Sequence, residues 1–188
     1  KKISEGANIN VCFVTGFHKE EFMPKWLDNL SDTEIYNLLV YEIENGVSSQ
    51  KLFPAAMKAG TSYKTVTSRE KRILSVEGNV QHDTKIPMVT HCDKGTMGLE
   101  QLQILKENGA NLEHVCLSHV DLQKDVSYIE KICDTGASVS FDHIGRELDN
   151  KDHDRVVMLE QLIKDGYQDQ ICLAGDMGRK KYFLSYNG

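Results

Sequence analysis

The stretch IPMVTHCDKGTMGLEQLQIL, residues 86–105, contains one complete unit of the fold. Its apolar start predicts a β-strand that ends at His91, and a short loop follows. Leu99, Leu102 and Leu105 then recur at the spacing of one helix face. The stretch therefore predicts a strand, a loop and a helix in succession, which is the repeating unit of a parallel α/β sheet.

The same unit recurs along the chain. Strands are expected at residues 9–15, 53–59, 87–91, 115–119, 137–142 and 171–176. Helices are expected at residues 32–45, 68–83, 98–108, 125–135 and 152–165. Six strands fall short of the eight that close a TIM barrel of typically about 250 residues. We therefore expect a single domain, residues 1–188, with roughly strands 3–8 of a (β/α)8 barrel and without its N-terminal strands and C-terminal helix.

Composition narrows the class of protein. The chain has 188 residues and a net charge of −6, and an acidic chain without a basic stripe argues against a nucleic-acid partner. No apolar run approaches the roughly 20 residues that cross a bilayer, and no signal-peptide pattern opens the chain. The five cysteines are scattered and form no CxxC pair, which favours a reduced, cytoplasmic protein. The expected partner is a small-molecule substrate, with a homodimer as the candidate assembly.

Polar residues of metal-ligand type end four of the expected strands. Lys58 closes FPAAMK, His91 closes IPMVTH, His119 closes HVCLSH and Asp176 closes QICLAGD. Taken singly, such residues are commonly a hydrogen-bonded histidine, a solvated lysine or a helix-capping aspartate. In a parallel barrel, however, the C-terminal strand ends meet on one face, and that face carries the chemistry. Four such residues at four strand ends favour a metal site.

The local sequences are more specific than the pattern. MKAGTSYKTVT, THCDKGTMGLEQLQIL, HVCLSHVD, VSFDHIGR and LAGDMGRKKY together resemble the phosphotriesterase family of the amidohydrolase superfamily. The resemblance runs from TGFH at residues 15–18 to the end of the chain. It implies a TIM-barrel hydrolase that uses metal ions, and it is similar in particular to the phosphotriesterase-like lactonase branch, whose substrates include phosphorylated sugar lactones.

The resemblance implies a role for each strand-end residue. Lys58 falls on a lysine that reacts with CO₂, so that the carboxylated lysine bridges two divalent metal ions. His91 and His119 fall on the ligands of the more exposed metal. Asp176 falls on the aspartate that binds the buried metal and takes the proton from a bridging hydroxide. Zinc is the expected metal, and manganese, cobalt or iron also suits these ligands.

Further residues suggest how a substrate is bound. Arg146, Arg179 and Tyr182 fall where the phosphorylated-lactone branch binds phosphate, and guanidinium groups bind phosphate bidentately. The alternative is that Arg146 pairs with acids on a solvated loop and that Arg179 only belongs to the exposed run RKK. His143 falls on a catalytic partner of the metal-bound aspartate, unless it is a surface histidine. His18 ends the first strand and is expected to line the substrate pocket.

One departure from the family affects every functional expectation. The first strand of the family ends in His-x-His, and no such motif occurs in these 188 residues. The chain alone is therefore expected to bind metal poorly and to be inactive. The leading interpretation is a lactonase that opens a small, phosphorylated lactone. Hydrolysis of phosphotriesters is the second reading, and a non-catalytic barrel scaffold is the third.

Overall fold

The computed structural model describes residues 2–146 and 150–186. In this part of the chain, strands and helices alternate and six parallel strands form one sheet in the order β1-β2-β3-β4-β5-β6. Strands that follow one another in the sequence are thus adjacent in the sheet. The strands are β1 (Val14–Gly16), β2 (Ala56–Thr61), β3 (Met88–Cys92), β4 (Val115–Ser118), β5 (Ser138–Phe141) and β6 (Ile171–Leu173).

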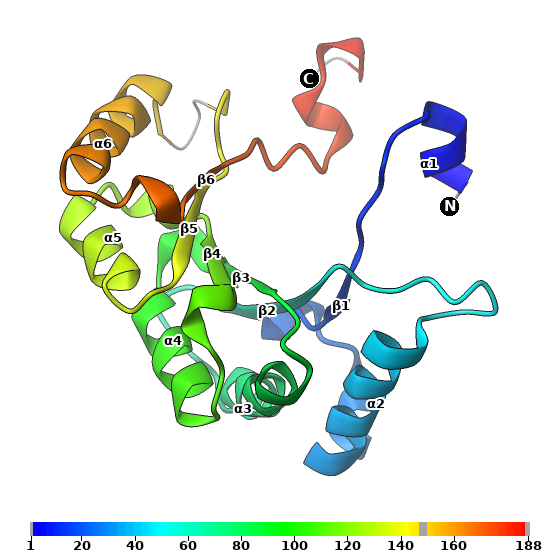
Figure 1. Cartoon of the computed structure of the whole chain (residues 1–188). Helices are drawn as coiled ribbons and strands as arrows, with labels where there is room; N and C mark the ends of the chain where they lie inside the picture. Colours follow the sequence, from blue (N-terminus) through cyan, green and yellow to red (C-terminus); the bar gives the residue numbers. More distant parts are fainter. Residues whose placement is uncertain (1, 147–149, 187–188) are drawn as a thin grey trace.

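Helices α2 to α6 follow the strands and lie along one side of the curved sheet, whereas α1 and the segment after β6 lie toward the other side (Figure 1). Helices α2 and α3 each begin with a capping box, in which Ser31 or Thr67 exchanges hydrogen bonds with the glutamate three residues later. The helices are α1 (Lys2–Ala7), α2 (Asp32–Asn45), α3 (Ser68–Thr84), α4 (Gly98–Glu107), α5 (Val126–Cys133) and α6 (Asp152–Lys164).

Strand side chains divide between a packed face and an open face. Met57, Met88 and Leu117 are at most 1% exposed and belong to the same hydrophobic core as the buried residues of the helices. The strand residues next to these, such as Lys58 after Met57 and Val89 after Met88, point to the opposite face and line a cavity. One face of the sheet is therefore a core against the helices, and the other is free to carry functional side chains.

The strand bounds differ most from the expected ones in three places. Residues 9–13 are not part of a strand, because β1 pairs only with β2 and only through Val14–Gly16. Lys58 does not close its strand, since β2 continues to Thr61 and stays paired with β3 throughout. Asp176 lies beyond the end of β6 at Leu173. Lys58 and Asp176 thus lie three residues from the ends of their strands, whereas His91 and His119 each lie within one residue of a strand end.

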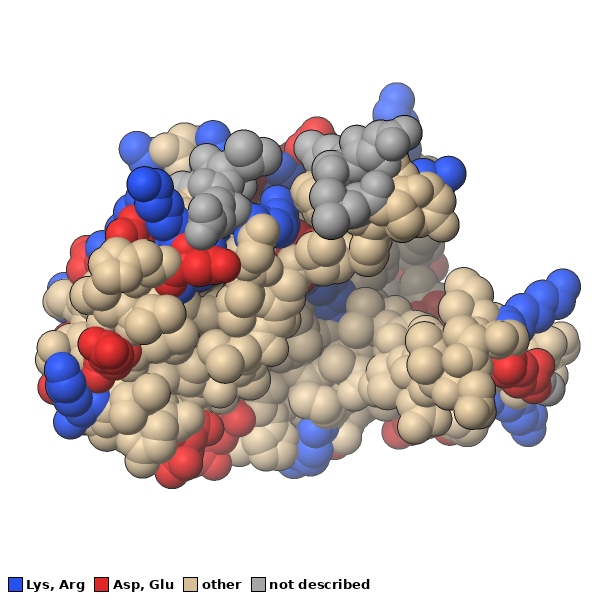
Figure 2. Space-filling view, turned by 90° about the horizontal axis from the view of Figure 1, so that it is seen from above, with Lys and Arg blue, Asp and Glu red and all other residues tan. Residues whose placement is uncertain are grey.

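The described sheet is open at both edges, because β1 and β6 each pair with one neighbour only. Val14 of β1 is 47% exposed and Leu173 of β6 is 63% exposed. Seen from above, the molecule is hollowed between two lobes (Figure 2). The chain therefore forms part of a barrel, as the sequence predicts. None of the described helices has the length and apolar character needed to cross a membrane.

Candidate metal centre

One cavity of about 460 Å³ brings the four predicted metal ligands together. Lys58 enters it from β2, His91 from β3, His119 from the residue after β4 and Asp176 from the segment after β6. The parallel sheet explains this meeting, because it places the carboxyl ends of its strands at one edge. The other residues that line the cavity are His18, Val89, Ser118, Ser140, Asp142 and Ala174.

Four imidazole rings form a row across this end of the sheet. The ring centroids of His18 and His91 are 4.3 Å apart, those of His91 and His119 are 4.6 Å apart, and those of His119 and His143 are 4.9 Å apart. Each ring comes from the end of a different strand. The ends of β1, β3, β4 and β5 thus supply a row of nitrogen donors, and neutral imidazole is a common metal ligand.

His119 is held in place by the carboxylate of Asp142. His119 Nδ1 lies 2.7 Å from Asp142 Oδ1, and the His119 amide donates to both carboxylate oxygens at 3.1 Å. Burial alone would raise the pKa of Asp142, but hydrogen bonds from His119 and His143 outweigh it and hold the pKa below its usual value. A carboxylate bound to Nδ1 fixes the orientation of the ring and leaves the Nε2 lone pair free to bind a metal. This arrangement is common around metal-binding histidines.

His91 provides the observation that tests whether a metal fits. Its Nε2 atom is buried and has no hydrogen-bond partner among the described residues, although buried polar atoms are nearly always satisfied. Burial and the nearby His119, His18 and Lys58 lower the pKa of His91 to about 2, so the ring is neutral. A neutral, unsatisfied ring nitrogen that lines a cavity is a suitable ligand for a divalent metal, and the residues present therefore fit such an ion.

Lys58 has the environment of a reactive amine. Burial lowers its pKa, although the negative charges of Asp142 and Asp176 and the thiols of Cys92 and Cys116 oppose the shift. A lysine that is desolvated in this way gives up its proton more readily and becomes a better nucleophile. The side chain thus meets the chemical requirement for reaction with CO₂, and the carboxylation itself stays a prediction.

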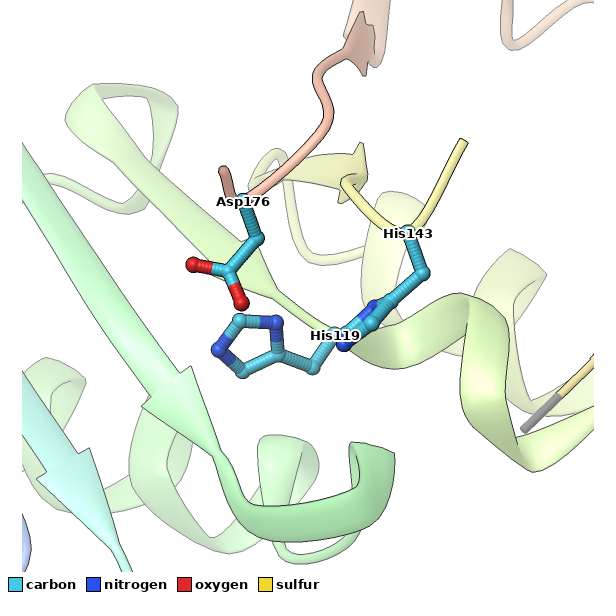
Figure 3. A group of neighbouring side chains, drawn as sticks. All are labelled: His119, His143 and Asp176. Atoms are coloured by element: carbon cyan, nitrogen blue, oxygen red, sulfur yellow. The ribbon is translucent and has the colours of Figure 1, made fainter. Parts of the chain in front are cut away.

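The groups of close donor atoms differ from the predicted set, and Asp121, Asp142 and His143 form one of them. Among the described residues, the potential ligand atoms of His119, His143 and Asp176 all lie within 4.8 Å of one another, and the Asp176 carboxylate is directed at the His119 ring (Figure 3). His91 and Lys58 line the same cavity without belonging to this group. The structure therefore brings His143 closer to the predicted ligands than the sequence indicates.

His143 is a buried residue, so the alternative of a surface histidine is wrong. It is 4% exposed, and its Nδ1 lies 3.1 Å from Asp142 Oδ1 and 3.4 Å from Asp121 Oδ1. Burial lowers the pKa of His143, but the two carboxylates outweigh that effect and raise the pKa to about 9. The carboxylates that position His143 are thus Asp142 and Asp121, and its predicted partner Asp176 has a ligand atom within 4.8 Å of that of His143.

An outer cavity of about 420 Å³ adjoins the first and contains most of the predicted substrate-binding residues. His18, Arg179 and Tyr182 line it, together with His91, His119 and Asp176 from the metal centre. Its remaining lining residues are Lys19, Glu21, Phe22, Asp93 and Gly178. Burial and the positive charges of Lys58 and Lys19 lower the pKa of His18 to about 4, which leaves a neutral ring in the pocket.

Arg146 contacts the predicted metal ligand Asp176, a pairing that the sequence does not indicate. Its Nη1 atom lies 2.6 Å from Asp176 Oδ2, and its guanidinium stacks over the Tyr182 ring at 4.3 Å. The side chain is only 17% exposed. Arg146 does pair with an acid, as one alternative holds, and among the described residues this acid is the predicted metal ligand Asp176.

Sequence reasoning missed three residues of the site. Asp142 and Asp121 hold the imidazoles, and the buried Arg155 binds Asp121 through Nε at 2.8 Å. The signals for the two aspartates are present, because Asp142 precedes His143 directly and Asp121 follows His119 by two positions. No sequence signal marks Arg155, which lies within a run of charged residues, KDHDR, typical of an exposed helix start.

Comparison with known proteins gives relatives along the whole chain. The sequence matches the family model described as "Phosphotriesterase family" over residues 1–188. It is 32% identical over 181 residues to the phosphotriesterase homology protein of Escherichia coli K12. This match covers 96% of this chain and 62% of the relative. It is also 32% identical to the phospho-furanose lactonase of Mycoplasmopsis synoviae, over 94% of this chain and 54% of the relative.

Solved structures give the same result for the fold. The crystal structure of the E. coli phosphotriesterase homology protein, complexed with phosphate in its active site, superposes with a TM-score of 0.94 at 31% identity. The match covers 100% of this chain and 65% of that protein. The chain thus spans less than two thirds of the length of these relatives, and the site described above lies in the shared part.

Proposed function

The chain belongs to the phosphotriesterase family, and we propose that its residues 1–188 act as one domain that carries the active site of a metal-dependent lactonase. The substrate that we propose is a small, phosphorylated sugar lactone. The observation that carries this proposal is the single cavity that contains Lys58, His91, His119 and Asp176 and adjoins Arg179 and Tyr182. The unpaired thiols of all five cysteines support a cytoplasmic setting.

The residues that would hold the metal are those of the deeper cavity. Carboxylated Lys58, His91, His119 and Asp176 would bind two divalent ions, with zinc preferred by the nitrogen-rich set and manganese, cobalt or iron compatible with it. When bound, the metal polarises the lactone carbonyl and lowers the pKa of water so that hydroxide is present at neutral pH. The chain itself contains no His-x-His motif, so the second ion receives only Lys58 and Asp176 from these residues.

The protein side chains handle the proton. Asp176 faces His119 in the donor group and is placed to accept the proton of the attacking water and to carry it to the leaving oxygen of the ring (Figure 3). His143 belongs to the same group and is buried against Asp142 and Asp121, so it is positioned to share that proton with Asp176. Asp176 and His143 are thus the catalytic residues that we propose.

The outer cavity favours an anionic substrate. Arg179 and Tyr182 line it, and Arg146 lies against the Tyr182 ring and Asp176. Two guanidinium groups and a phenol are suited to the oxygens of a phosphate. The phospho-furanose lactonase among the relatives supports this substrate class. His18, on the other side of the cavity, would contact the lactone ring.

A substrate panel tests the proposal. The 188-residue chain and the longest open reading frame that encodes it are loaded with zinc and assayed with a phosphorylated sugar lactone, its unphosphorylated analogue and a phosphotriester. We expect the phosphorylated lactone to have the highest kcat/KM, by about 10²-fold over its analogue, because two charge-assisted hydrogen bonds contribute roughly 1.5–3 kcal/mol each.

Two variants control the panel. Arg179→Ala should remove most of the preference and leave slow turnover of the neutral lactone, whereas Arg69→Ala, which pairs with Asp28 outside both cavities, should change neither rate. Equal turnover of both lactones contradicts the phosphate clamp. Faster turnover of the phosphotriester supports the second reading instead. Inactivity of the metal-loaded longer protein on all three substrates supports a scaffold, whereas inactivity of the 188-residue chain alone is expected.

A further inference from the structure

Arg155 is the largest fully buried side chain among the described residues, and it lies in the first turn of α6 at 1% exposure. Its guanidinium is bound on every side. Nε donates to Asp121 Oδ2 at 2.8 Å, and Nη1 donates to the Asn150 carbonyl at 3.0 Å and to Asp152 Oδ1 at 2.7 Å. Nη2 donates to the Arg146 carbonyl at 3.4 Å. One side chain therefore collects four acceptors.

Two of these acceptors, the Arg146 and Asn150 carbonyls, belong to the connection between β5 and α6, and a third, Asp152, is the first residue of α6. The Asp152 carboxylate, held by Arg155, accepts the Gly145 amide at 3.0 and 3.1 Å. The Arg146 amide donates to the His143 carbonyl at 2.9 Å, and the Arg146 carbonyl accepts from Arg155. The backbone is thus held at the Gly145 amide and at the amide and carbonyl of Arg146, whose side chain reaches Asp176.

The fourth acceptor connects Arg155 to the metal centre. Asp121 is 0% exposed, and while Oδ2 binds Arg155, Oδ1 lies 3.4 Å from His143 Nδ1. Asn150 Nδ2 donates to the Asp121 carbonyl at 3.3 Å, which ties the same loop to the segment after β4. Arg155 itself lines neither cavity. Any influence of Arg155 on the reaction must therefore pass through Arg146 or His143.

We propose that Arg155 is a positioning residue that holds the β5–α6 connection so that Arg146 faces the phosphate of the substrate and His143 faces Asp176; the inference rests on the proposed function. Arginine suits this position better than lysine, because a guanidinium group offers five donors in a rigid fork and can bind all four acceptors, whereas an ammonium group offers three. A buried ion pair often contributes little net stability, because removing its charges from water is costly. We therefore assign the Arg155–Asp121 pair a role in positioning.

Amide hydrogen exchange tests the holding role without any substrate. Arg155→Lys keeps the charge beside Asp121 and loses the fork, so we expect exchange at the Gly145 and Arg146 amides to become at least about tenfold faster. The matched control is Arg69→Lys, since Arg69 also binds a carboxylate through Nε, Asp28 Oδ1 at 2.7 Å, and a carbonyl through Nη2, Pro24 at 2.8 Å. Exchange at the two amides no faster than in the control overturns the proposal.

The kinetic part separates positioning from support of the fold. We expect Arg155→Lys to lower the kcat/KM ratio of phosphorylated to neutral lactone by about tenfold, because small misplacement of a binding group costs rate steeply. Asp152→Ala serves as the second variant should Arg155→Lys not fold, since Asp152 is 38% exposed and its loss frees Gly145. If amide exchange becomes faster while the kcat/KM ratio of the two lactones is unchanged, Arg155 only stabilises the loop, and the positioning role is contradicted. A wild-type protein that opens neither lactone refutes the proposed function, while exchange still decides whether Arg155 holds the loop.

Discussion

His119 adopts a left-handed backbone conformation, with φ of 71°, that residues other than glycine reach only at a cost of about 1–3 kcal/mol. Asp142 offsets this cost, because it accepts both the amide and the ring N–H of His119. The same carboxylate contacts His143. A single residue thus sets the direction of two imidazoles, and the strained backbone is a consequence of turning His119 back over the strand ends.

The first prediction concerns Asp142. Asp142→Ala leaves the His119 ring free to rotate, so we expect metal affinity to fall by about 10–100-fold, the usual effect of losing a residue that orients a ligand. Zinc affinity measured against a competing chelator gives the value. Asp83→Ala is the control, because Asp83 accepts a hydrogen bond from Tyr36 outside both cavities. Unchanged affinity in Asp142→Ala shows that His119 is not a ligand or needs no such partner.

The second prediction concerns Lys58. Lys58→Ala should lose bound metal and activity, and short carboxylic acids should restore part of both by replacing the anionic oxygens of the carbamate. Metal content and rate are measured with and without added acetate, next to Lys71→Ala, an exposed lysine on α3. A Lys58→Ala protein that retains its full metal content and activity rules out the bridging role.

At the scale of an element, α3 holds the mouth of the site through buried carboxylates. Glu70 Oε1 accepts the Glu20 amide at 2.9 Å and Glu77 Oε1 accepts the Phe17 amide at 3.1 Å, and both glutamates are 0% exposed. The backbone between these two amides carries His18, which lines both cavities. Helix α3 therefore fixes the segment after β1, although it contributes no residue to either cavity.

The third prediction concerns the titration of Glu77. Burial raises its pKa well above 4.5, against the opposing effects of the Phe17 amide and the charge of Lys58. Because the folded state binds this proton more tightly than the unfolded state, the contribution to stability is complete below pH 4.5 and is lost as the pH rises through the folded pKa. Glu77→Gln keeps an acceptor for Phe17 and removes the titration.

We therefore expect the free energy of unfolding of Glu77→Gln to rise relative to wild type between pH 4.5 and 8, by about 1.4 kcal/mol for each unit by which the pKa is raised. Urea unfolding across this range provides the measurement, with Glu107→Gln, an exposed glutamate on α4, as the control. If the difference between Glu77→Gln and wild type is independent of pH, Glu77 does not titrate between the two states.

The elements show what a sequence can and cannot predict. Helices α2 and α3 were predictable because each shows an apolar face and a capping box, at Ser31 and Thr67, whereas α4 was predictable from its apolar face alone. Strand ends were less predictable, since the position of Lys58 within β2 depends on pairing with β3 and not on its own neighbours. Arg155 was beyond prediction because its burial depends on acceptors from two separate segments.

At the scale of the whole molecule, the open sheet and the site belong together. The predicted ligands lie on the face that the helices leave free, and the described strands close no barrel around it. The convergence of Lys58, His91, His119 and Asp176 could be predicted, because parallel strand ends meet regardless of detail. The pairing of Arg146 with Asp176 could not, because it joins two loops whose paths only the folded chain defines.

The central claim is that these four residues bind the catalytic metal, and anomalous diffraction from zinc-loaded crystals tests it most directly. We predict an anomalous peak in the 460 Å³ cavity with the Nε2 atoms of His91 and His119 at about 2.0–2.1 Å from it, and additional density on Lys58 Nζ for a carboxylate. A peak bound only by His119, His143 and Asp176, with His91 free, or no peak in this cavity after loading, would contradict the claim.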